Sequence, residues 1–461
     1  MSKKTIQTIN PSTEEVIETY EVFGEERTMG CLEESKEAFS SWRLQMVDER
    51  ASRTKKLAET IRSRGDKLAE LMTREMGKVP SEAKEEVELC ASICDYTAEN
   101  ASSQLAEEER DMEGGRALVS YQPIGVILGI QPWNFPLYQA IRYSVPNVTA
   151  GNTTLLKHAP NVWGMAREIE QMFRDAGFPK GALIAVQADN PGTETLIRHQ
   201  DVRAVTMTGS GSAGREIARK AASELKKTVL ELGSNDGYVI LSDADLELAV
   251  ECAVKGRFNN VGQTCVAAKR FIIEDAIYDD FRDAYLEAVK KLTYGDPAKE
   301  DGVDMGPMAR RDLRDTLHQQ VMASIHKGAR CLTGGKMPDR KGFFYEPTIL
   351  EDVKPDMPAY DDELFGPVAS LIRVKDSDEA MRVANDSRFG LGGGIFSGDE
   401  KRAVKLARQH FDTGMVNING YSLAQPNLPF GGVKASGYGR EHGGFGIREF
   451  VNVKAIMIAQ K

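Results

Sequence analysis

The chain has 461 residues, of which 41% are hydrophobic and 28% charged, so it is long enough for two large domains, with the ordinary composition of a globular enzyme. A formal net charge of −10 argues against a nucleic-acid partner, because phosphate-binding surfaces are basic. No apolar run is long enough to cross a membrane, and residues 1–10 lack the apolar stretch of a secretory signal. We therefore expect a cytoplasmic protein with no membrane partner.

Cysteine and histidine usage gives no sign of a metal. The six cysteines are scattered without a Cys-x-x-Cys pair, and the six histidines show no ligand spacing of the His-Glu-x-x-His type. Cys90 and Cys94 lie one helical turn apart, which fits two small residues on one helix face better than a metal site. We predict no metal and no disulfide framework.

In chain order, residues 27–104 carry charged and apolar side chains at helical spacing, which predicts amphipathic helices that cover a sheet. The charged segment 107–115 comes next. It is either a solvated loop or part of an arm, because residues 116–121 then look like an extended strand.

From residue 124 the sequence pattern changes to short apolar runs that alternate with glycine or proline turns and helical stretches. Strands are predicted at 124–130, 153–156, 182–186, 204–207 and 228–232. The same pattern restarts after Gly237, with strands at 238–241, 271–273, 368–374, 391–396 and 415–418 and a helix capped near Ser242 or Asp243. This alternation is typical of βαβ units, so we predict an α/β fold with two parallel-sheet domains that meet near residues 233–237.

A rigid amide donor is predicted directly after the first of these strands. Pro132-Trp133-Asn134-Phe135-Pro136 places Asn134 between two prolines. Ligands bind beyond the carboxyl ends of parallel strands, and a fixed amide is suited to stabilise a developing oxyanion.

Residues 208–214 form a Gly-x-Gly-x-x-Gly pattern between a predicted strand and a predicted helix, which is typical of an anion-binding helix N-terminus. In the dinucleotide fingerprint an acidic residue about 20 positions downstream binds a ribose hydroxyl, and Glu231 stands there. The alternative role for Glu231 is that of a general base. It lies between Leu230 and Leu232, and apolar surroundings raise the pKa of a carboxyl group toward the useful range.

One cysteine stands apart from the others by its surroundings. Cys265 follows Gly262 and Gln263, after a predicted helix and before a predicted strand. Only a thiolate is a strong nucleophile, so a reactive cysteine needs a loop with electropositive help. Taken alone, a cysteine among small residues is more often an unreactive packed residue. The motifs around Asn134, residues 208–214 and Glu231 favour the interpretation of Cys265 as a catalytic nucleophile.

Together these motifs resemble those of the aldehyde dehydrogenase superfamily, in the same order and over essentially the whole chain. Residues 362–367 (Asp-Glu-Leu-Phe-Gly-Pro) and the glycine-rich segment 429–437 are similar to that family's later signatures. Within the superfamily the chain looks most like the short bacterial and archaeal-type succinate-semialdehyde dehydrogenases. Residues 157–161 and 417–421 carry this finer resemblance, as does an N-terminus that begins almost directly at Asn10-Pro11.

The resemblance implies a Rossmann-like NAD(P)-binding domain (1–104 and 124–233), a catalytic domain (234–444) and a small β oligomerisation arm (105–123 and 445–461). It also implies assembly into a homodimer or a dimer of dimers.

For the reaction, the resemblance implies that Cys265 attacks the aldehyde carbon, and that the amide of Asn134 and the backbone N–H of Cys265 hold the oxyanion. Glu231 would activate the water that hydrolyses the thioester, which replaces its ribose role. NAD or NADP would be the cofactor, with Lys157 and Glu363 on the two riboses. The implied cofactor-site residues are Trp133, Asn134, Lys157, His158, Ala159, Pro160, Gly209, Ser210, Leu232, Glu363 and Phe365.

Two positions depart from the family pattern. Ser234 stands where a second glycine usually follows the base, so we expect altered loop packing there. Pro160 stands where NAD-preferring relatives often carry a glutamate. Because proline neither accepts from a ribose hydroxyl nor repels a phosphate, both cofactors are admissible, and Lys157 and His158 could favour the phosphate of NADP.

The implied substrate is succinate semialdehyde, oxidised to succinate. Arg142 lies eight residues, or about two helical turns, past Asn134 and would clamp the distal carboxylate, helped by Tyr421 or Ser422. A second arginine of some relatives is Asn259 here. The alternative is that Arg142 is packed in an interdomain salt bridge.

The sequence also admits other functions. The same chemistry on another small aldehyde, such as glutarate semialdehyde or lactaldehyde, is the nearest alternative. A non-catalytic binding or structural role is disfavoured because Cys265, Glu231 and Asn134 are all present. A CoA-acylating reaction is disfavoured because Glu231 is retained for water activation.

Overall fold

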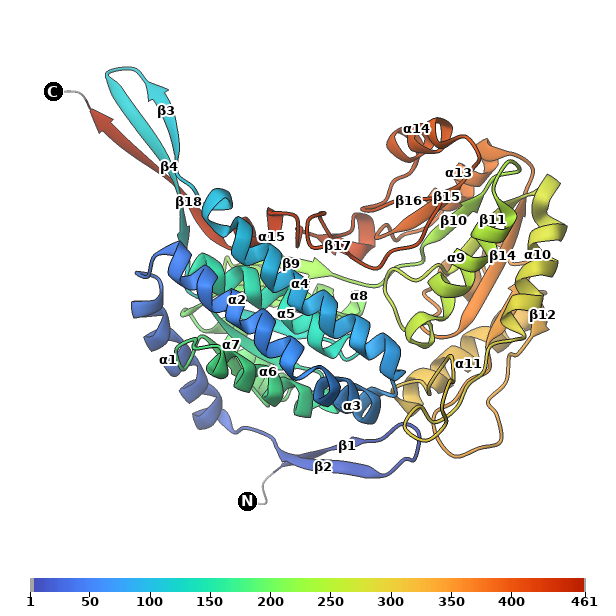
Figure 1. The fold of residues 1–461 in the computed structure, drawn as a ribbon, viewed down its shortest axis with the longest axis horizontal. Helices are drawn as coiled ribbons and strands as arrows, with labels where there is room; N and C mark the ends of the chain where they lie inside the picture. Colours follow the sequence, from blue (N-terminus) through green and yellow to red (C-terminus); the bar gives the residue numbers. More distant parts are fainter. Residues whose placement is uncertain (1–3, 460–461) are drawn as a thin grey trace.

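The computed structural model describes residues 4–459; residues 1–3 and 460–461, at the ends of the predicted cofactor domain and arm, lie outside it. Figure 1 shows two lobes, a long hairpin that runs from one lobe to the other, and a narrow β arm that projects from the first lobe. The fold is α/β with two mainly parallel sheets, as predicted.

The first lobe is built on a six-stranded sheet of order β17-β9-β8-β5-β6-β7. Its strands are β5 (Val126–Gln131), β6 (Thr153–His158), β7 (Leu183–Ala185), β8 (Val202–Thr208), β9 (Lys227–Glu231) and β17 (Gly437–Tyr438). Neighbouring strands are parallel except β17 and β9. The strand order reverses between β5 and β8, and such a switch point leaves a ligand crevice at the carboxyl ends of the strands.

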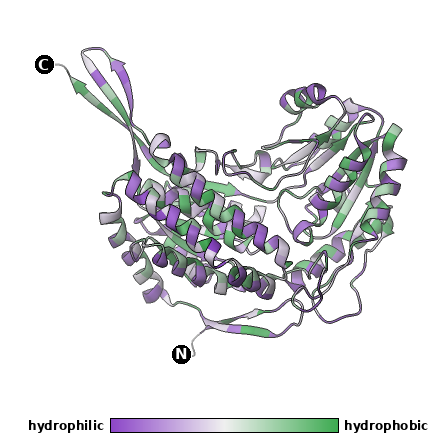
Figure 2. Ribbon diagram, viewed as in Figure 1, coloured by the Kyte–Doolittle hydropathy of each residue, from purple (hydrophilic) through white to green (hydrophobic). Residues whose placement is uncertain are grey.

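Helices cover this sheet and bury an apolar stripe against it. They are α1 (Glu25–Trp42), α2 (Val47–Ser63), α3 (Gly65–Met76), α4 (Pro80–Gln104), α5 (Pro136–Ala150), α6 (Trp163–Asp175), α7 (Asn190–Arg198) and α8 (Gly211–Ser223). In α2, the residues Leu57, Ala58 and Ile61 recur at helical spacing and are fully buried. Figure 2 shows the matching alternation of hydrophilic and hydrophobic residues along these outer helices.

The second lobe has a seven-stranded sheet of order β12-β13-β14-β11-β10-β15-β16, parallel except for β12. Its strands are β10 (Gly237–Ile240), β11 (Arg270–Glu274), β12 (Arg330–Thr333), β13 (Thr348–Glu351), β14 (Val368–Val374), β15 (Gly393–Phe396) and β16 (Asn417–Ile418). Its helices are α9 (Leu246–Phe258), α10 (Asp275–Val289), α11 (Arg311–His326), α12 (Pro358–Asp361), α13 (Ser377–Asn385) and α14 (Glu400–His410).

The two sheets meet end to end. Strand β9 leaves the first sheet at Glu231, and β10 enters the second at Gly237 after only a short connection. The carboxyl edge of the first sheet therefore faces the amino edge of the second, and the segments at both edges converge on one region between the lobes.

The arm is a three-stranded antiparallel sheet of β3 (Glu108–Met112), β4 (Gly115–Pro123) and β18 (Val451–Ala459). In the chain, β18 follows the short helix α15 (Phe445–Glu449). The charged segment 107–115 is thus mostly strand rather than solvated loop. Glu108 pairs with Val119 and Met112 with Gly115. Strand β18 pairs with β4 along its full length and forms one edge of the arm.

The hairpin of β1 (Thr5–Ile9) and β2 (Val16–Glu21) joins the lobes on the opposite side from the arm (Figure 1). Its turn contacts the second lobe, where Phe343 N–H donates to the carbonyl oxygen of Pro11 at 2.8 Å. No helix within residues 4–459 combines the length and apolar character that a membrane crossing needs.

The predicted cap of α9 was wrong by two to three residues. The helix is capped by Asp245, whose carboxylate accepts from Leu248 N–H at 3.1 Å. The two predicted residues are engaged elsewhere: Asp243 accepts from Ser397 Oγ at 2.9 Å, and Ser242 N–H donates to Glu274 at 2.7 Å. Tertiary contacts therefore moved the start of the helix along the chain.

Candidate active site

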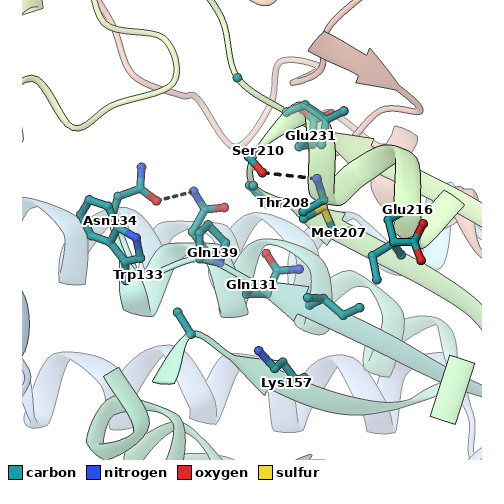
Figure 3. Close-up of a pocket in the computed structure, with 18 of the residues that line it drawn as sticks. Gln131, Trp133, Asn134, Gln139, Lys157, Met207, Thr208, Ser210, Glu216 and Glu231 are labelled. Carbon is teal, nitrogen blue, oxygen red and sulfur yellow. Dashed lines mark hydrogen bonds between the residues drawn. The ribbon is translucent and has the colours of Figure 1, made fainter. Parts of the chain in front are cut away.

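The switch point of the first sheet opens into a cavity of ≈ 680 Å³ that reaches to the second lobe. Its walls come from the segment after β5, the segment after β8, strand β6 and the segment after β9, together with Cys265, Glu363 and Phe365 of the second lobe. Figure 3 shows Asn134 and Trp133 at one end of this pocket and Lys157 across it from Glu231. The cavity thus gathers residues that are widely separated in the sequence.

The nucleophile segment begins with a strained turn. Asn260, Val261 and Gly262 have φ angles of 53°, 58° and 69°, so three consecutive residues adopt the left-handed conformation. For a β-branched residue such as Val261 this conformation is a genuine outlier, which persists only where the surroundings hold it in place. At Gly262 a side chain is excluded as well, because a Cβ would lie 2.3 Å from the carbonyl oxygen of Gly366.

The turn is held by contacts from both lobes. Asn260 N–H donates to the carboxylate of the half-buried Glu82 on α4 at 2.9 Å, and Asn260 Nδ2 donates to the carbonyl oxygen of Asn134 at 2.8 Å. Arg257 Nη2 donates to the carbonyl oxygen of Gly262 at 2.6 Å. These contacts fix where Cys265 enters the cavity.

Asn134 lies beside the nucleophile segment. Its Nδ2 donates to the carbonyl oxygen of Gln263 at 2.9 Å, which orients the amide and leaves its second N–H for another acceptor. Both Asn134 and Cys265 line the cavity. None of the described residues accepts from the backbone N–H of Cys265. Two donors are therefore available next to the thiol, as an oxyanion site requires.

Glu231 lies at the end of β9 in the same cavity and is 2% exposed. Neither carboxyl oxygen has a hydrogen-bond partner among the described residues. Desolvation raises its pKa well above the ordinary value, although the positive charge of Arg142 works in the opposite direction. This direction agrees with the expectation from the sequence, while the role of Glu231 as a general base stays a prediction.

The thiol of Cys265 is half-buried, and desolvation raises its pKa to about 11. The positive charges of Arg142 and Lys269 lower this pKa, while Glu363 and Glu231 raise it. The site therefore contains both a candidate nucleophile and cations that favour its ionised form.

The cavity suits a dinucleotide. Helix α8 directs its N-terminus into it behind Gly209 and Ser210, and Ser210 caps the helix by accepting from Ala213 N–H at 3.3 Å. A helix N-terminus attracts phosphate, and the carboxylate of Glu363 is an acceptor of the kind that ribose hydroxyls need. Trp133 and Phe365 form an edge-to-face pair with ring centroids 5.9 Å apart in the wall.

Of the predicted cofactor residues, all but one line this cavity. The exception is His158, for which the expected contact with a cofactor phosphate is wrong. Side chains alternate along β6, so Lys157 points to the cavity and His158 to the interior. The His158 Nε2 atom lies 2.8 Å from the carbonyl oxygen of Pro136, and burial lowers the pKa of the imidazole to about 4.

The predicted substrate residues are not brought together in one wall. Arg142 is 1% exposed, forms an ion pair with Glu441, and donates from Nη2 to Thr208 Oγ1 at 2.9 Å. This buried salt bridge is the alternative that the sequence left open. Ser422 lines a second cavity of ≈ 250 Å³, and Tyr421 lines neither cavity.

Three charged residues at the site were not predicted from the sequence: the buried Lys269 and Glu441 and the half-buried Glu82. A lysine four positions after the candidate nucleophile was a visible signal for Lys269. The other two lie far from the motifs in sequence and carried no local signal. Among residues 4–459 no group of His, Cys, Asp and Glu is placed to hold a metal ion.

Comparison with known proteins decides the family. The sequence profile described as "Aldehyde dehydrogenase family" matches residues 1–456. The chain belongs to the aldehyde dehydrogenase family.

Individual relatives of this aldehyde dehydrogenase cover nearly its whole length. It is 44% identical to the succinate semialdehyde dehydrogenase (NAD(P)+) Sad of Escherichia coli K12, over 97% of this chain and 96% of that one. It is 42% identical to the succinate-semialdehyde dehydrogenase (NADP+) of Deinococcus radiodurans, over 98% and 95%. The crystal structure of succinic semialdehyde dehydrogenase from Streptococcus pyogenes in complex with NADP+ superposes with a TM-score of 0.96 at 37% identity, covering 98% of this chain and 100% of that one.

Proposed function

We propose that this aldehyde dehydrogenase oxidises succinate semialdehyde to succinate, with NAD or NADP as the hydride acceptor. The observation that carries the reaction type is the presence of Cys265, Asn134 and Glu231 in one dinucleotide-sized cavity. The substrate is supported by relatives of that activity that match nearly the whole chain at 42–44% identity.

In the proposed mechanism the thiolate of Cys265 adds to the aldehyde carbon. The second N–H of the Asn134 amide and the backbone N–H of Cys265 donate to the oxygen as it becomes negative. Bound dinucleotide supplies an acceptor for the hydride that leaves this carbon, after which a thioester remains on Cys265. Glu231 then takes a proton from the water that hydrolyses the thioester. Because burial raises the pKa of Glu231, this last step is faster on the alkaline side of the ordinary carboxyl range.

Both dinucleotides fit the residues around Lys157. Burial lowers the pKa of this lysine, and Pro160 presents no carboxylate beside it. A ribose hydroxyl and a ribose phosphate are therefore both compatible with this part of the cavity, since neither meets a repelling charge from Pro160.

The distal carboxylate of the substrate is assigned to Arg142. Its Nη1 has no hydrogen-bond partner among the described residues, and its guanidinium lies 4.8 Å from the ring centroid of Phe430. Phe430 lines the second cavity together with Ser422 and Val266, the residue after the nucleophile. Arg142 lines neither cavity, so an aldehyde in this second cavity would approach its guanidinium only past Phe430, and Ser422 would contact the same aldehyde from the cavity wall. Tyr421, whose buried hydroxyl has no hydrogen-bond partner within residues 4–459, remains a predicted contributor.

The arm is assigned to self-association, giving a homodimer or a dimer of dimers. The supporting observation is the exposure of apolar residues on its edge strand β18, where Val453 is 60% and Met457 72% exposed. A cytoplasmic location stays a prediction; it suits a chain in which the described cysteines are all free thiols.

The decisive experiment measures reduced-cofactor formation with succinate semialdehyde, with NAD and NADP supplied separately. We expect turnover with at least one of them, no turnover in Cys265→Ala, and in Glu231→Gln a single burst followed by a steady rate lower by roughly 100- to 10,000-fold. If the folded protein shows no turnover with either cofactor, succinate semialdehyde is excluded as its substrate. Glutarate semialdehyde and lactaldehyde are then the next compounds to measure.

A further inference from the structure

A buried lysine lies directly beneath the candidate nucleophile. Lys269 is 2% exposed, and its Nζ donates to the carbonyl oxygens of Cys265 at 2.6 Å and Thr264 at 3.1 Å. The same Nζ forms an ion pair with Glu363 Oε1 at 3.2 Å. An ammonium group has three N–H donors and no acceptor, so these three oxygens account for its whole capacity.

Packing alone does not explain a lysine at this position. Burial of an ammonium is costly even when it is paired, and an apolar side chain of similar length would fill the same space without that cost. Two of its three acceptors are backbone oxygens of the nucleophile segment itself. We therefore attribute the lysine at position 269 to its contacts with these backbone oxygens and with Glu363.

Lys269 joins two parts of the site that have no covalent connection nearby. On one side it fixes the peptide groups on either side of the nucleophile. On the other it contacts Glu363, a carboxylate in the wall of the cofactor cavity that also accepts from Ser234 N–H at 3.0 Å. A Cβ at Gly233 would lie 2.2 Å from Glu363 Oε2, so a side chain at this position would displace the carboxylate from its observed place.

The charged and titratable groups around the thiol of Cys265 are few, and they come from several elements. They are Arg142 and Tyr138 of α5, Glu231 of β9, Glu363 before β14, Tyr421 after β16 and Lys269 itself. Both cations are paired with a carboxylate, Arg142 with Glu441 and Lys269 with Glu363, and both lower the pKa of the thiol. Lys269 is the cation that contacts the backbone of the nucleophile directly, and its charge lowers the pKa of the thiol.

We propose that Lys269 is a positioning residue that holds the nucleophile segment, links it to the Glu363 carboxylate of the cofactor cavity, and supplies positive charge that makes Cys265 reactive. The inference deepens the proposed function and rests on the role of Cys265 as nucleophile. Lys269 contacts neither substrate nor the reacting atoms; it acts through the main chain and through its field.

The test is the rate of iodoacetamide alkylation of Cys265 as a function of pH, followed by mass spectrometry of the peptide that contains it, without aldehyde or dinucleotide. For Lys269→Met we expect an alkylation rate at pH 8 lower by about tenfold, the change produced by one unit of thiol pKa. Lys269→Arg keeps the charge and restores much of the rate. Glu363→Gln removes a negative charge that raises the thiol pKa, so it changes the rate in the opposite direction and alkylation becomes faster.

The matched control is Lys405→Met on α14, an exposed lysine far from the site, which leaves the alkylation profile unchanged. A wild-type profile in folded Lys269→Met overturns the proposal, as does a shift of Glu363→Gln in the same direction as Lys269→Met. If thermal unfolding shows that Lys269→Met does not fold, the double variant Lys269→Met/Glu363→Gln, which leaves neither charge of this pair buried alone, is compared with Glu363→Gln, and equal alkylation rates in these two overturn the proposal. Because the alkylation assay contains no aldehyde, its result can be interpreted even if succinate semialdehyde proves not to be the substrate.

Discussion

At the scale of single residues, the site depends on how buried charges share a small volume. Burial raises the pKa values of both Glu231 and Cys265, and the charge of Arg142 lowers both. Arg142 is itself paired with the buried carboxylate of Glu441. Glu441 therefore determines how much of the positive charge of Arg142 remains for the thiol, for Glu231 and for a substrate carboxylate.

The proposed carboxylate clamp is tested by separating the charge of Arg142 from its structural partner. Loss of Arg142 alone would leave Glu441 buried and unpaired, a cost of about 3–5 kcal/mol in the free energy of unfolding. The double variant Arg142→Met/Glu441→Gln avoids this cost and is compared with Glu441→Gln, which keeps the clamp. We expect kcat/KM for succinate semialdehyde to fall roughly 10- to 100-fold between the two, because hydrogen bonds to charged groups are worth about 1.5–3 kcal/mol. Butanal, which lacks the carboxylate, should change little; equal losses for both aldehydes would mean that Arg142 is structural.

Among the helices and strands, α4 of the first lobe stabilises the turn at residues 260–262, which precedes Cys265 in the second lobe. Glu82, in the first turn of α4, accepts from both Asn259 Nδ2 and Asn260 N–H through a single carboxyl oxygen. Asn260, Val261 and Gly262 can therefore stay in the left-handed conformation that directs Cys265 into the cavity. Because Glu82 belongs to the first lobe, the turn has this support only when the two lobes are packed together.

Burial raises the pKa of Glu82 from 4.5 to about 7, which makes the stability of this contact dependent on pH. A raised pKa means that the folded state holds a proton which the unfolded chain has already lost. The contribution of Glu82 to stability is thus complete below about pH 4.5 and declines as the pH rises to about 7. Glu82→Gln keeps the accepting oxygen and removes the charge, so it should abolish this part of the pH dependence of thermal unfolding.

Glu82→Ala is the contrasting variant because it removes the acceptor. It leaves Asn260 N–H buried without a partner, which costs about 1–3 kcal/mol, and it should slow turnover as the turn relaxes. Equal unfolding temperatures and activities for Glu82→Ala and Glu82→Gln would show that the contact does not hold the turn.

At the scale of the whole molecule, the cavity is shaped by two sheets that meet end to end, while the arm extends away from both (Figure 1). Strand β18 leaves one edge of the arm sheet without a partner strand within residues 4–459. An exposed apolar edge of this kind is stable in solution when another chain covers it.

Light scattering tests the assembly directly. We expect a dimer or a dimer of dimers, and a smaller species for Met457→Asp, which places a charge on the exposed apolar face of β18. Lys405→Asp on α14, an exposed lysine away from the arm, should leave the assembly unchanged. A monomeric wild-type protein at working concentrations would contradict the assignment of the arm.

Much of the fold was predictable because its signals are local. The change from helical spacing before residue 104 to alternating strands and helices after 124 predicted an α/β fold, and each predicted run from 124 onward lies at or beside a strand of the two sheets. Strands β12, β13 and β17 of these sheets were not predicted. The charged segment 107–115 could not be decided from the sequence. Its strand exists because β4 and β18 provide partners, and β18 comes from the far end of the chain.

The family and the candidate catalytic residues were predictable from the sequence, since Asn134, Glu231 and Cys265 each lie in a short motif whose composition reflects a local requirement. The charges that surround these residues became known only from the tertiary structure. Glu82 reaches the nucleophile turn across 178 residues, and Glu363 reaches Ser234 across 129. It also showed that His158 points inward and that Arg142 is paired. The physical reason is that buried charges are stabilised by whatever partners the fold places within a few ångströms, and spacing along the chain does not encode that proximity.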